Sequence, residues 1–475
     1  MSLLGEHTGL YTDHYELVMA QGYFLSSKRN DSAVFDYFFR GAPYRGAFAV
    51  FAGLENLLEM ISNFRFSEKD CKFLRERGFN AEFVDYLSRF RFRGNIYAPP
   101  EGEVVFPLEP VIQVEGNIIE TQLIETLLLN TVNFETLIAT KANRIRNMAG
   151  DKLVVDFGMR RAQGTGSLQA SRAAIVGGAD STSNIYSAML YDIESTGTQA
   201  HSWIQSFDDE LTSFREFAKA FPDKCILLVD TYDTLNQGIP NAITVAGEME
   251  ERGQKLLGVR LDSGDLAYLS KKARKMLDDA GFEYVKIVVS NKLDEYVIRS
   301  LREQKAPIDA FGVGTSLITG RNDAALDGVY KLAECDNKPR LKISNDLEKI
   351  ILPGKKKVYR FFDSCNYFYA DGICMKDEDD PKIIYHPIHP EKHVDVSALR
   401  REELAKPVML EGKRTVPQKS VKEIAKYARK RLQHLEDEHK RLEFPHIYKV
   451  GISQKLMNIR TSIVNEMKNK VSGKS

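Results

Sequence analysis

Seven short apolar segments between residues 153 and 315 constrain the fold of this chain more than any other feature. Each ends in a cluster of glycine, carboxylate or hydroxyl residues, and helical patterns separate most of them, most clearly at 266–280 and 293–304. Continuous apolar strands that alternate with helices are typical of a parallel sheet covered on both faces. This succession predicts a closed or nearly closed α/β barrel, with an open doubly wound sheet as the alternative. The predicted strands are 153–158, 173–178, 191–196, 226–231, 257–262, 286–291 and 310–315.

The segment before residue 130 has a different texture. It is rich in aromatic residues at 34–40, and alternating apolar and polar residues at 103–106 and 110–116 predict a small sheet. Residues 118–148 then carry leucine and isoleucine at helical spacing, which predicts one broken helix or two.

Beyond residue 329 the pattern changes again. Residues 340–351 and 358–375 are predicted antiparallel strands, with Asp371-Gly372 as a turn. Residues 420–443 have the pattern of an amphipathic helix capped by Ser420. Two further predictions are a solvated turn at Lys355–Lys357, with contact to a phosphate as the alternative, and a disordered tail after Val471.

The composition excludes several classes of function. The 66 basic residues balance the 66 acidic ones among 475 residues, so no global field draws the chain to nucleic acid or an anionic membrane. The sequence lacks a secretion signal and any run near the ~18 apolar residues of a membrane span, which predicts a cytoplasmic protein. The five cysteines are scattered, without zinc-ligand spacing, and are expected to be reduced and mostly buried.

Polar residues follow the predicted strands at their carboxyl ends, where barrels of this kind carry their working residues. Gly312, Gly314, Thr315 and Ser316 stand at the end of the last predicted strand. Backbone amides without side-chain bulk can converge there on phosphate oxygens, and the hydroxyls can donate beside them. A tight turn from strand to loop would account for the same residues without a ligand.

Two arginines, Arg160 and Arg161, come shortly after the first predicted strand. Because guanidinium binds phosphate through a planar pair of donors, adjacent arginines suit a diphosphate. Phe157 is placed to offer a ring face to an aromatic ligand. If no ligand binds there, both arginines would form surface ion pairs.

The segment 259–265 is the most specific of these clusters. Strand alternation directs Arg260 and Asp262 to one face, and if that face points at the barrel mouth, a cation and an acid share one pocket. A carboxylate there can hold sugar hydroxyls or a magnesium ion, and Asp230 and Asp233 could extend the acidic rim. A buried Arg–Asp ion pair with a purely structural role would show the same pattern.

His201 is the only histidine between Tyr15 and Tyr385, and it lies two residues before Trp203, the only tryptophan. Imidazole titrates near neutrality and also acts as a nucleophile. A lone histidine is most often structural, but the polar clusters at the other strand ends favour a catalytic role.

Eight motifs, in this order, resemble those of the nicotinate phosphoribosyltransferase family and span residues 10–332. The C-terminal third is less similar. The motifs are Thr12-Asp13-x-Tyr15, Phe35-x-x-Phe38-Phe39-Arg40, residues 160–164, Gly197-Thr198-x-Ala200-His201-Ser202, residues 259–265, Val289-Ser290-Asn291, Gly312-x-Gly314-Thr315-Ser316 and residues 328–332.

This resemblance implies a type II phosphoribosyltransferase fold. Its parts are an irregular, nearly closed α/β barrel and a second α+β domain built from both ends of the chain. On this basis residues 1–130 form the N-terminal segment, 131–335 form the barrel with the active site, and 336–475 pack with the N-terminal domain. The family is usually dimeric, which implies a homodimer with shared active sites.

The resemblance also implies a reaction on the salvage route to NAD. Nicotinate and phosphoribosyl pyrophosphate would give nicotinate mononucleotide and pyrophosphate, coupled to hydrolysis of the co-substrate ATP to ADP and phosphate, with Mg²⁺ as cofactor. The family's histidine in Gly-Thr-x-Ala-His is phosphorylated by ATP and corresponds to His201.

Other roles carry over residue by residue. The motif tyrosine, Tyr15, would lie against the pyridine ring, reaching into the partner subunit's pocket. Arg160 and Arg260 would lie near anionic groups, Asp262 near the ribose, and the Gly314–Thr315 step at the 5′-phosphate. The predicted substrate-binding set also includes Phe157, Arg161, Asp180, Thr198, Asp230, Ser263 and Gly312, and no residue is assigned as a metal ligand.

Glycosyl transfer passes through an oxocarbenium-like state, so positioning and charge control would carry catalysis, with Arg260 as first choice for the nicotinate carboxylate. No Walker lysine motif is present for ATP. Asp180, placed after a predicted strand, could favour nicotinamide instead. The sequence is also compatible with a sugar-phosphate barrel lyase that uses Lys286 or Lys292, and with a non-catalytic binding barrel.

Overall fold

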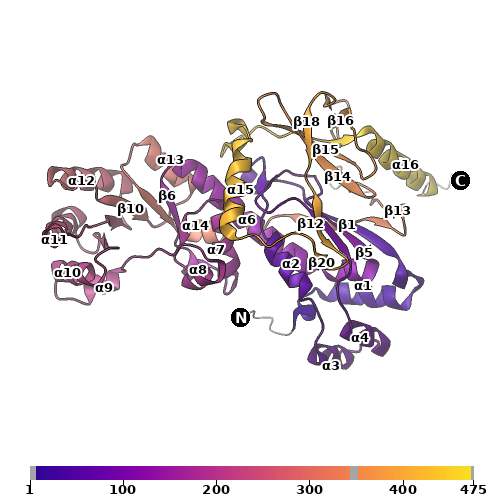
Figure 1. Ribbon diagram of the computed structural model, residues 1–475, viewed down its shortest axis with the longest axis horizontal. Coiled ribbons are helices and arrows are strands. Elements are labelled where there is room, and N and C mark those ends of the chain that lie inside the picture. Colours follow the sequence, from indigo (N-terminus) through magenta and orange to yellow (C-terminus); the bar gives the residue numbers. More distant parts are fainter. Residues whose placement is uncertain (1–6, 343–350, 472–475) are drawn as a thin grey trace. The chain divides into compact units, whose positions relative to one another are not determined.

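A computed structural model describes residues 7–342 and 351–471, which form two compact units (Figure 1). Unit 1 comprises Met1–Leu137 with Ala325–Ser475, and unit 2 comprises Ile138–Ala324. The sequence placed the boundaries at 130/131 and 335/336. Both differ from the observed boundaries at 137/138 and 324/325, the second because residues 328–335 form a strand in a sheet of unit 1. Residues 343–350 of one predicted strand, and the tail after Val471, lie outside the described residues.

The described part of unit 1 contains two large sheets and a two-stranded ribbon. The antiparallel seven-stranded sheet has the order β13 (Lys338–Pro339), β12 (Gly328–Cys335), β1 (Ser32–Phe39), β5 (Ile112–Asn117), β3 (Asn95–Ala98), β19 (Lys406–Leu410), β20 (Lys413–Arg414). The mixed six-stranded sheet has the order β17 (His393–Asp395), β16 (Ile383–Tyr385), β21 (Val450–Ser453), β15 (Phe368–Met375), β14 (Lys356–Phe362), β18 (Arg400–Glu403). The ribbon pairs β2 (Ala49–Val50) with β4 (Val104–Val105).

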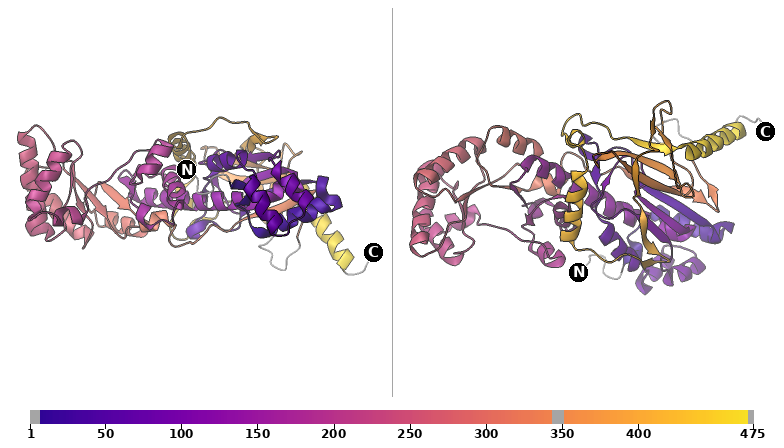
Figure 2. Two further views of the ribbon diagram at one scale, coloured as in Figure 1. Left: turned by 90° about the horizontal axis from the view of Figure 1, so that it is seen from below. Right: turned by 45° about the horizontal axis from the view of Figure 1, so that its top comes forward.

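The helices of unit 1 pack on these sheets and on one another (Figures 1 and 2). Residues 118–149 form two helices, as predicted. The helices are α1 (His14–Leu25), α2 (Leu54–Ser62), α3 (Glu68–Glu76), α4 (Ala81–Ser88), α5 (Ile118–Leu123), α6 (Glu125–Ala149), which crosses the unit boundary, α15 (Val421–Gln433) and α16 (Gln454–Val471).

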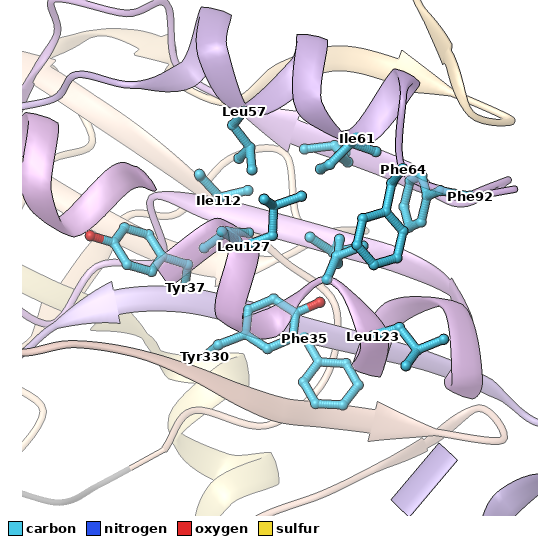
Figure 3. Close-up of a cluster of buried hydrophobic side chains, with 14 of the residues drawn as sticks. Phe35, Tyr37, Leu57, Ile61, Phe64, Phe92, Ile112, Leu123, Leu127 and Tyr330 are labelled. Atoms are coloured by element: carbon cyan, nitrogen blue, oxygen red, sulfur yellow. The ribbon is translucent and has the colours of Figure 1, made fainter. Parts of the chain in front are cut away.

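The core of unit 1 forms where α2, α5 and α6 pack on the seven-stranded sheet (Figure 3). Phe35 of β1 stacks on Tyr330 of β12 with ring centroids 4.7 Å apart, and the Tyr330 hydroxyl donates to the Thr121 carbonyl at 2.9 Å. β1 is therefore held from both sides, by β5 and by β12.

A buried network of charges lies in the second sheet of unit 1. Arg360 of β14 donates to both carboxylate oxygens of Asp371, at 2.9 and 2.6 Å, and to Glu103 at 2.7 Å. Arg431 donates to the same Glu103 carboxylate at 2.8 Å. The neighbouring carboxylates raise the pKa of Arg360 against the opposing effect of burial.

Three predictions for the C-terminal region are wrong in detail. Asp371-Gly372 lies inside β15, and the chain turns at residues 363–367 instead. Lys356 is buried in β14, where it forms an ion pair with Asp36 at 2.7 Å, so that Lys355–Lys357 is not a solvated turn. The helix at Ser420 has the expected cap but ends at Gln433, ten residues before the predicted end.

Unit 2 contains one parallel sheet of six strands. Its order is β7 (Ser181–Thr182), β6 (Leu153–Asp156), β11 (Ala310–Val313), β10 (Lys286–Ser290), β9 (Gly258–Leu261), β8 (Ile226–Leu228). The chain is thus an α/β protein, but near-closure of the barrel is not confirmed, because β7 and β8 are the two edges of this sheet.

Helices connect these strands, and α10, α11 and α12 pack side by side (Figure 2). The helices of unit 2, besides the end of α6, are α7 (Gly166–Gly177), α8 (Ile185–Tyr191), α9 (His201–Gln205), α10 (Glu210–Ala220), α11 (Ile239–Glu251), α12 (Leu266–Asp279), α13 (Glu295–Glu303) and α14 (Thr315–Ile318), with a 3₁₀ turn at Met159–Arg161 and a π-helical turn at Thr234–Gly238.

Two of the seven predicted strands are wrong. Residues 173–178 belong to the end of α7, because alanine favours helix. This helix also packs closely on its neighbour, since a Cβ at Gly177 would lie 2.0 Å from the Ala139 carbonyl oxygen. Residues 191–196 contribute only a single bridge, between Ser195 and Thr182. The strand that the sequence missed is β7, two residues long.

Two simpler expectations concern cysteines and membranes. All five cysteines are free thiols, four of them buried and Cys365 exposed. Within residues 7–342 and 351–471, no helix has both the length and the apolar character that crossing a bilayer requires.

Candidate active site

The polar clusters of unit 2 follow β6, β8, β9, β10 and β11, which all run in the same direction. Parallel strands bring their carboxyl ends to one edge of a sheet, where ligands bind in folds of this class. The predicted residues after these five strands therefore share one edge.

Asp262 and Asp230 are linked at this edge by hydrogen bonds. The Asp230 Oδ2 atom accepts from the backbone N–H of Asp262 and from the Ser263 hydroxyl, both at 2.7 Å. The Ser290 hydroxyl, at the end of β10, donates to Oδ1 of Asp262. Asp230 thus fixes the backbone of Asp262, and Ser290 orients its carboxylate, whose Oδ2 atom faces other partners.

His201 begins α9 and lies beside this carboxylate. Its Nε2 atom is 4.0 Å from Oδ2 of Asp262, and the two side chains are 39% and 33% exposed. Its Nδ1 atom lies 3.1 Å from the hydroxyl oxygen of Thr231, which follows β8. The imidazole is therefore oriented by two loops and open to a ligand.

Arg260 completes the centre. Its Nη2 atom donates to the carbonyl of Gln199 at 3.1 Å, which ties β9 to the segment before His201. Burial lowers the pKa of Arg260, while Asp262 and Asp230 raise it and Arg160 lowers it further. The predicted cation and acid thus do share one environment.

Several polar atoms around this centre are buried and have no hydrogen-bond partner among the described residues. They are Nε of Arg260, Oδ1 of Asp230 and both amide atoms of Gln199. Leaving such atoms unpaired costs about 1–3 kcal/mol each, and unpaired polar groups of this kind are found at catalytic sites.

Phe157 packs between the ends of β6 and β11. A Cβ at Gly312 would lie 2.4 Å from the Phe157 ring, and one at Gly314 would lie 3.2 Å from the Phe157 carbonyl oxygen. The ring occupies the space that a side chain at Gly312 would fill, which is the physical reason for glycine there. Thr315 is exposed at the start of α14.

Hydrogen bonds to Asp156 hold the loop that carries Phe157. This buried carboxylate accepts from Gly158 N–H, Ser171 and Thr182, each at 2.8 Å. Burial raises its pKa, against the effect of these hydrogen bonds. The loop that carries Phe157 is therefore fixed to α7 and β7.

Arg160 and Arg161 lie exposed in the 3₁₀ turn after this loop. Among the residues that the structure describes, neither guanidinium has a carboxylate within 4.0 Å, which argues against a role in surface ion pairs. Both are available to an anionic ligand.

Other predicted residues are not brought to this cluster. Asp180 accepts from the N–H of Val154 at 2.8 Å and forms an ion pair with Arg146, so it lies at the amino end of β6. Asp233 caps the π-helical turn through Asn236 N–H at 2.9 Å. The sequence placed Asp180 after a strand only because residues 173–178, which end α7, were interpreted as that strand.

The remaining candidates lie as follows. Thr198 donates to the Gln199 carbonyl at 3.3 Å, three residues before His201. Tyr15 is in unit 1, on α1, 44% exposed, with its pKa raised by burial and by Glu125. The lyase candidate Lys286 begins β10, at the amino end of the sheet, and lies 3.6 Å from Asp309.

Sequence reasoning assigned no role to three residues of the site, Thr231, Ser290 and Gln199, although Ser290 belongs to one of the eight family motifs. Thr231 and Ser290 were at the ends of predicted strands, and hydroxyls in that place were a usable signal. Gln199 is only 6% exposed, and no local sequence pattern indicates this burial.

Comparison with known proteins identifies the family. Sequence profiles of the nicotinate phosphoribosyltransferase (NAPRTase) N-terminal domain, family and C-terminal domain match residues 10–133, 153–372 and 355–460. The chain is 41% identical to nicotinate phosphoribosyltransferase of Bacillus subtilis, over 97% of this chain and 96% of that protein.

The chain belongs to the nicotinate phosphoribosyltransferase family. A Dictyostelium discoideum relative, also named nicotinate phosphoribosyltransferase, is 36% identical over 96% of this chain and 88% of its own length. The crystal structure of human nicotinic acid phosphoribosyltransferase superposes with a TM-score of 0.84 at 30% identity, covering 95% of this chain and 99% of that one. The fold of this nicotinate phosphoribosyltransferase family member is thus shared along nearly its whole length.

Proposed function

We propose that this chain transfers the phosphoribosyl group of phosphoribosyl pyrophosphate to nicotinate, forming nicotinate mononucleotide and pyrophosphate for NAD salvage. The observation that carries this proposal is the cluster of His201, Asp262 and Arg260 at one strand edge, in a chain of this family. The Bacillus subtilis and Dictyostelium discoideum relatives carry the same activity in their names.

The sugar is activated by loss of pyrophosphate from its anomeric carbon. Asp262, oriented by Ser290, is placed to accept hydrogen bonds from the ribose hydroxyls. Arg160 and Arg161 are exposed near the same edge and would stabilise charge on the departing pyrophosphate. The pyridine nitrogen is already nucleophilic and needs no general base.

The remaining substrate contacts follow from the same edge. Phe157 would offer its ring to the pyridine, and Arg260 would pair with the carboxylate. Gly314 and Thr315, together with Thr198 and Ser263, would donate hydrogen bonds to phosphate oxygens. Asp180 is not included, because Arg146 already holds it at the amino end of β6.

ATP coupling would proceed through His201. A proton on Nδ1, donated to Thr231, leaves the Nε2 lone pair free to attack the γ-phosphorus of ATP, with ADP departing. Water would later hydrolyse the N–P bond to release phosphate. The added charge of about −2 beside Asp262 would change the affinity for substrates and products.

Magnesium would be held by Asp262, whose side chain is one-third exposed, together with phosphate oxygens of the substrate. Mg²⁺ commonly binds through one or two carboxylates plus substrate phosphates. It would supply positive charge to the pyrophosphate.

The sheet of unit 2 would be the curved wall of an irregular barrel, since the Thr182–Ser195 bridge continues it past β7. A homodimer would place Tyr15 of one subunit in its partner's site, which accords with the exposure of Tyr15, Val18 and Met19 on α1. Light scattering on the purified chain measures its oligomeric state.

One assay tests the activity. The purified chain is incubated with phosphoribosyl pyrophosphate, Mg²⁺ and either nicotinate or nicotinamide, with and without ATP, and mononucleotide is measured. We expect product from nicotinate, with stimulation by ATP. The proposal would be overturned if mononucleotide formed from nicotinamide but not from nicotinate, or if it formed from neither base.

A further inference from the structure

A hollow of about 420 Å³ lies in unit 1, and no residue of the predicted active site lines it. It is formed by the end of α1 and the turn after it, by α4, by the segment 89–93, and by Glu120 of α5. Ligand sites for small molecules have volumes of roughly 300–1,000 Å³.

The hollow is rich in arginine. Within the described residues, none of its arginines has a carboxylate within 4.0 Å, and all of them are exposed. Arginine without an acidic partner is well suited to bind phosphate through paired donors. These residues are Arg29, Arg89, Arg91 and Arg93.

Most of the acidic charge in the lining is already engaged. Asp85 forms an ion pair with Arg75 at 2.5 Å. Glu120 accepts from the backbone N–H of Arg93 at 2.7 Å, and burial raises its pKa. Of the three acidic residues that line the hollow, only Glu82 has no hydrogen bond or ion pair in the described part of the chain. The hollow therefore favours an anion.

Aromatic rings form one wall of the hollow. The rings of Phe24 and Tyr86 are 5.4 Å apart, and the ring of Phe90 lies 6.3 Å from that of Tyr86. The guanidinium carbon of Arg29 lies 4.0 Å from the centroid of Phe24. A guanidinium on an aromatic ring presents its other face to a planar base, as in base recognition by arginine.

We propose that this hollow binds a nucleoside phosphate, with the base on Arg29 and Tyr86 and the phosphate held by Arg91 and Arg93. The combination of a stacking surface with arginines that have no acidic partner in the described part of the chain distinguishes this ligand from a bare phosphate ion, although Arg91 also donates to the Phe90 carbonyl at 2.5 Å. The site is additional to the substrate sites proposed in unit 2.

Hydrogen–deuterium exchange of the full chain, with AMP as the probe, tests this proposal because it locates the bound nucleotide. We expect AMP to protect backbone amides at residues 24–30 and 82–93. Arg29→Glu and Arg91→Glu should each lower the affinity measured from this protection at least tenfold. Arg77→Glu, the same charge change on an exposed residue outside the hollow, is the matched control and should have no effect.

The possible outcomes separate clearly. Protection confined to unit 2, or protection at 82–93 that survives both charge reversals, would overturn the proposal. Equal protection by inorganic phosphate would overturn the assignment of a nucleoside. The milder Arg29→Ala change keeps the test valid if a charge reversal unfolds the chain, and thermal midpoints identify that case.

Discussion

The two ring nitrogens of His201 face different loops: Nδ1 lies 3.1 Å from the Thr231 hydroxyl, and Nε2 lies 4.0 Å from the Asp262 carboxylate. The hydroxyl fixes the orientation of the ring, and the carboxylate can stabilise positive charge on it. The imidazole is therefore held in place between two loops of the candidate site.

Removing the imidazole should separate the two proposed half-reactions. We expect His201→Ala to keep slow phosphoribosyl transfer and to lose its stimulation by ATP. The reason is that Arg260 and Asp262, which would carry the transfer, are unchanged in this variant. Initial rates with and without ATP measure this, with Gln205→Ala, exposed on the same helix, as control. Equal ATP stimulation in the mutant and the unmodified chain would refute the role of His201.

Ser290 should act by positioning Asp262. Replacing it with alanine removes the hydrogen bond to Oδ1, and bonds to charged groups contribute about 1.5–3 kcal/mol. We expect kcat/KM for phosphoribosyl pyrophosphate to fall roughly tenfold to a hundredfold, with the thermal midpoint little changed. Ser300→Ala, at an exposed position on α13, should leave both quantities as they are. An unchanged kcat/KM in Ser290→Ala would contradict this role.

Gly312 should not tolerate alanine. The added methyl would lie 2.4 Å from the ring of Phe157, so the ring must move, and overpacking typically costs about 1–3 kcal/mol. We expect a raised KM for nicotinate and a lower thermal midpoint. Gly197→Ala is the control, because a Cβ there meets nothing within 4 Å. Equal behaviour of the two variants would show that the Phe157 contact has no importance.

Arg360 should be essential for the stability of unit 1. Arg360→Met fills a similar volume but leaves Asp371 and Glu103 without their shared cation, a loss expected to cost about 3–5 kcal/mol. Calorimetry should show a clear fall in the midpoint of unfolding. Lys275→Met breaks an exposed pair with Asp279, should cost less than about 1 kcal/mol, and serves as control.

The stability of unit 1 should depend on pH through Glu16. Burial raises the pKa of this carboxyl from 4.5 to about 7, although Thr12 and Thr126 donate hydrogen bonds to it. The folded state therefore favours the protonated form, and this contribution is present at low pH and is lost as the pH rises from 4.5 through about 7.

Glu16→Gln should flatten the dependence of the thermal midpoint on pH between 4.5 and about 7, and the exposed Glu59→Gln should not. One pKa unit corresponds to about 1.4 kcal/mol. The same pH profile in Glu16→Gln and in the unmodified chain would contradict the assignment.

The sequence indicated most of the strands in unit 2 because buried parallel strands are continuous apolar runs with a polar end. The same signal failed at 173–178, where an apolar run of equal length belongs to α7. Length and alanine content could have favoured helix there. The two residues of β7 are too few to show any pattern.

The candidate site was predictable where chemistry and strand ends coincide, as for Arg260, Asp262 and His201. Asp180 illustrates the limit, since its place depended on a misassigned strand and its partner Arg146 is 34 residues away. The burial of Lys356 was equally hidden, because Asp36 lies far from it in the sequence. Long-range partners of this kind follow only from the tertiary fold.

The pairing of β1 with β12 has a consequence for synthesis on the ribosome. Strand β1 emerges early, yet its neighbour at residues 328–335 appears only after every residue of unit 2 has been translated. Until then the nascent chain carries an unsatisfied sheet edge of aromatic residues, which is a hazard for aggregation. All residues of the inserted unit, including His201, are thus synthesised before the seven-stranded sheet of unit 1 can be completed.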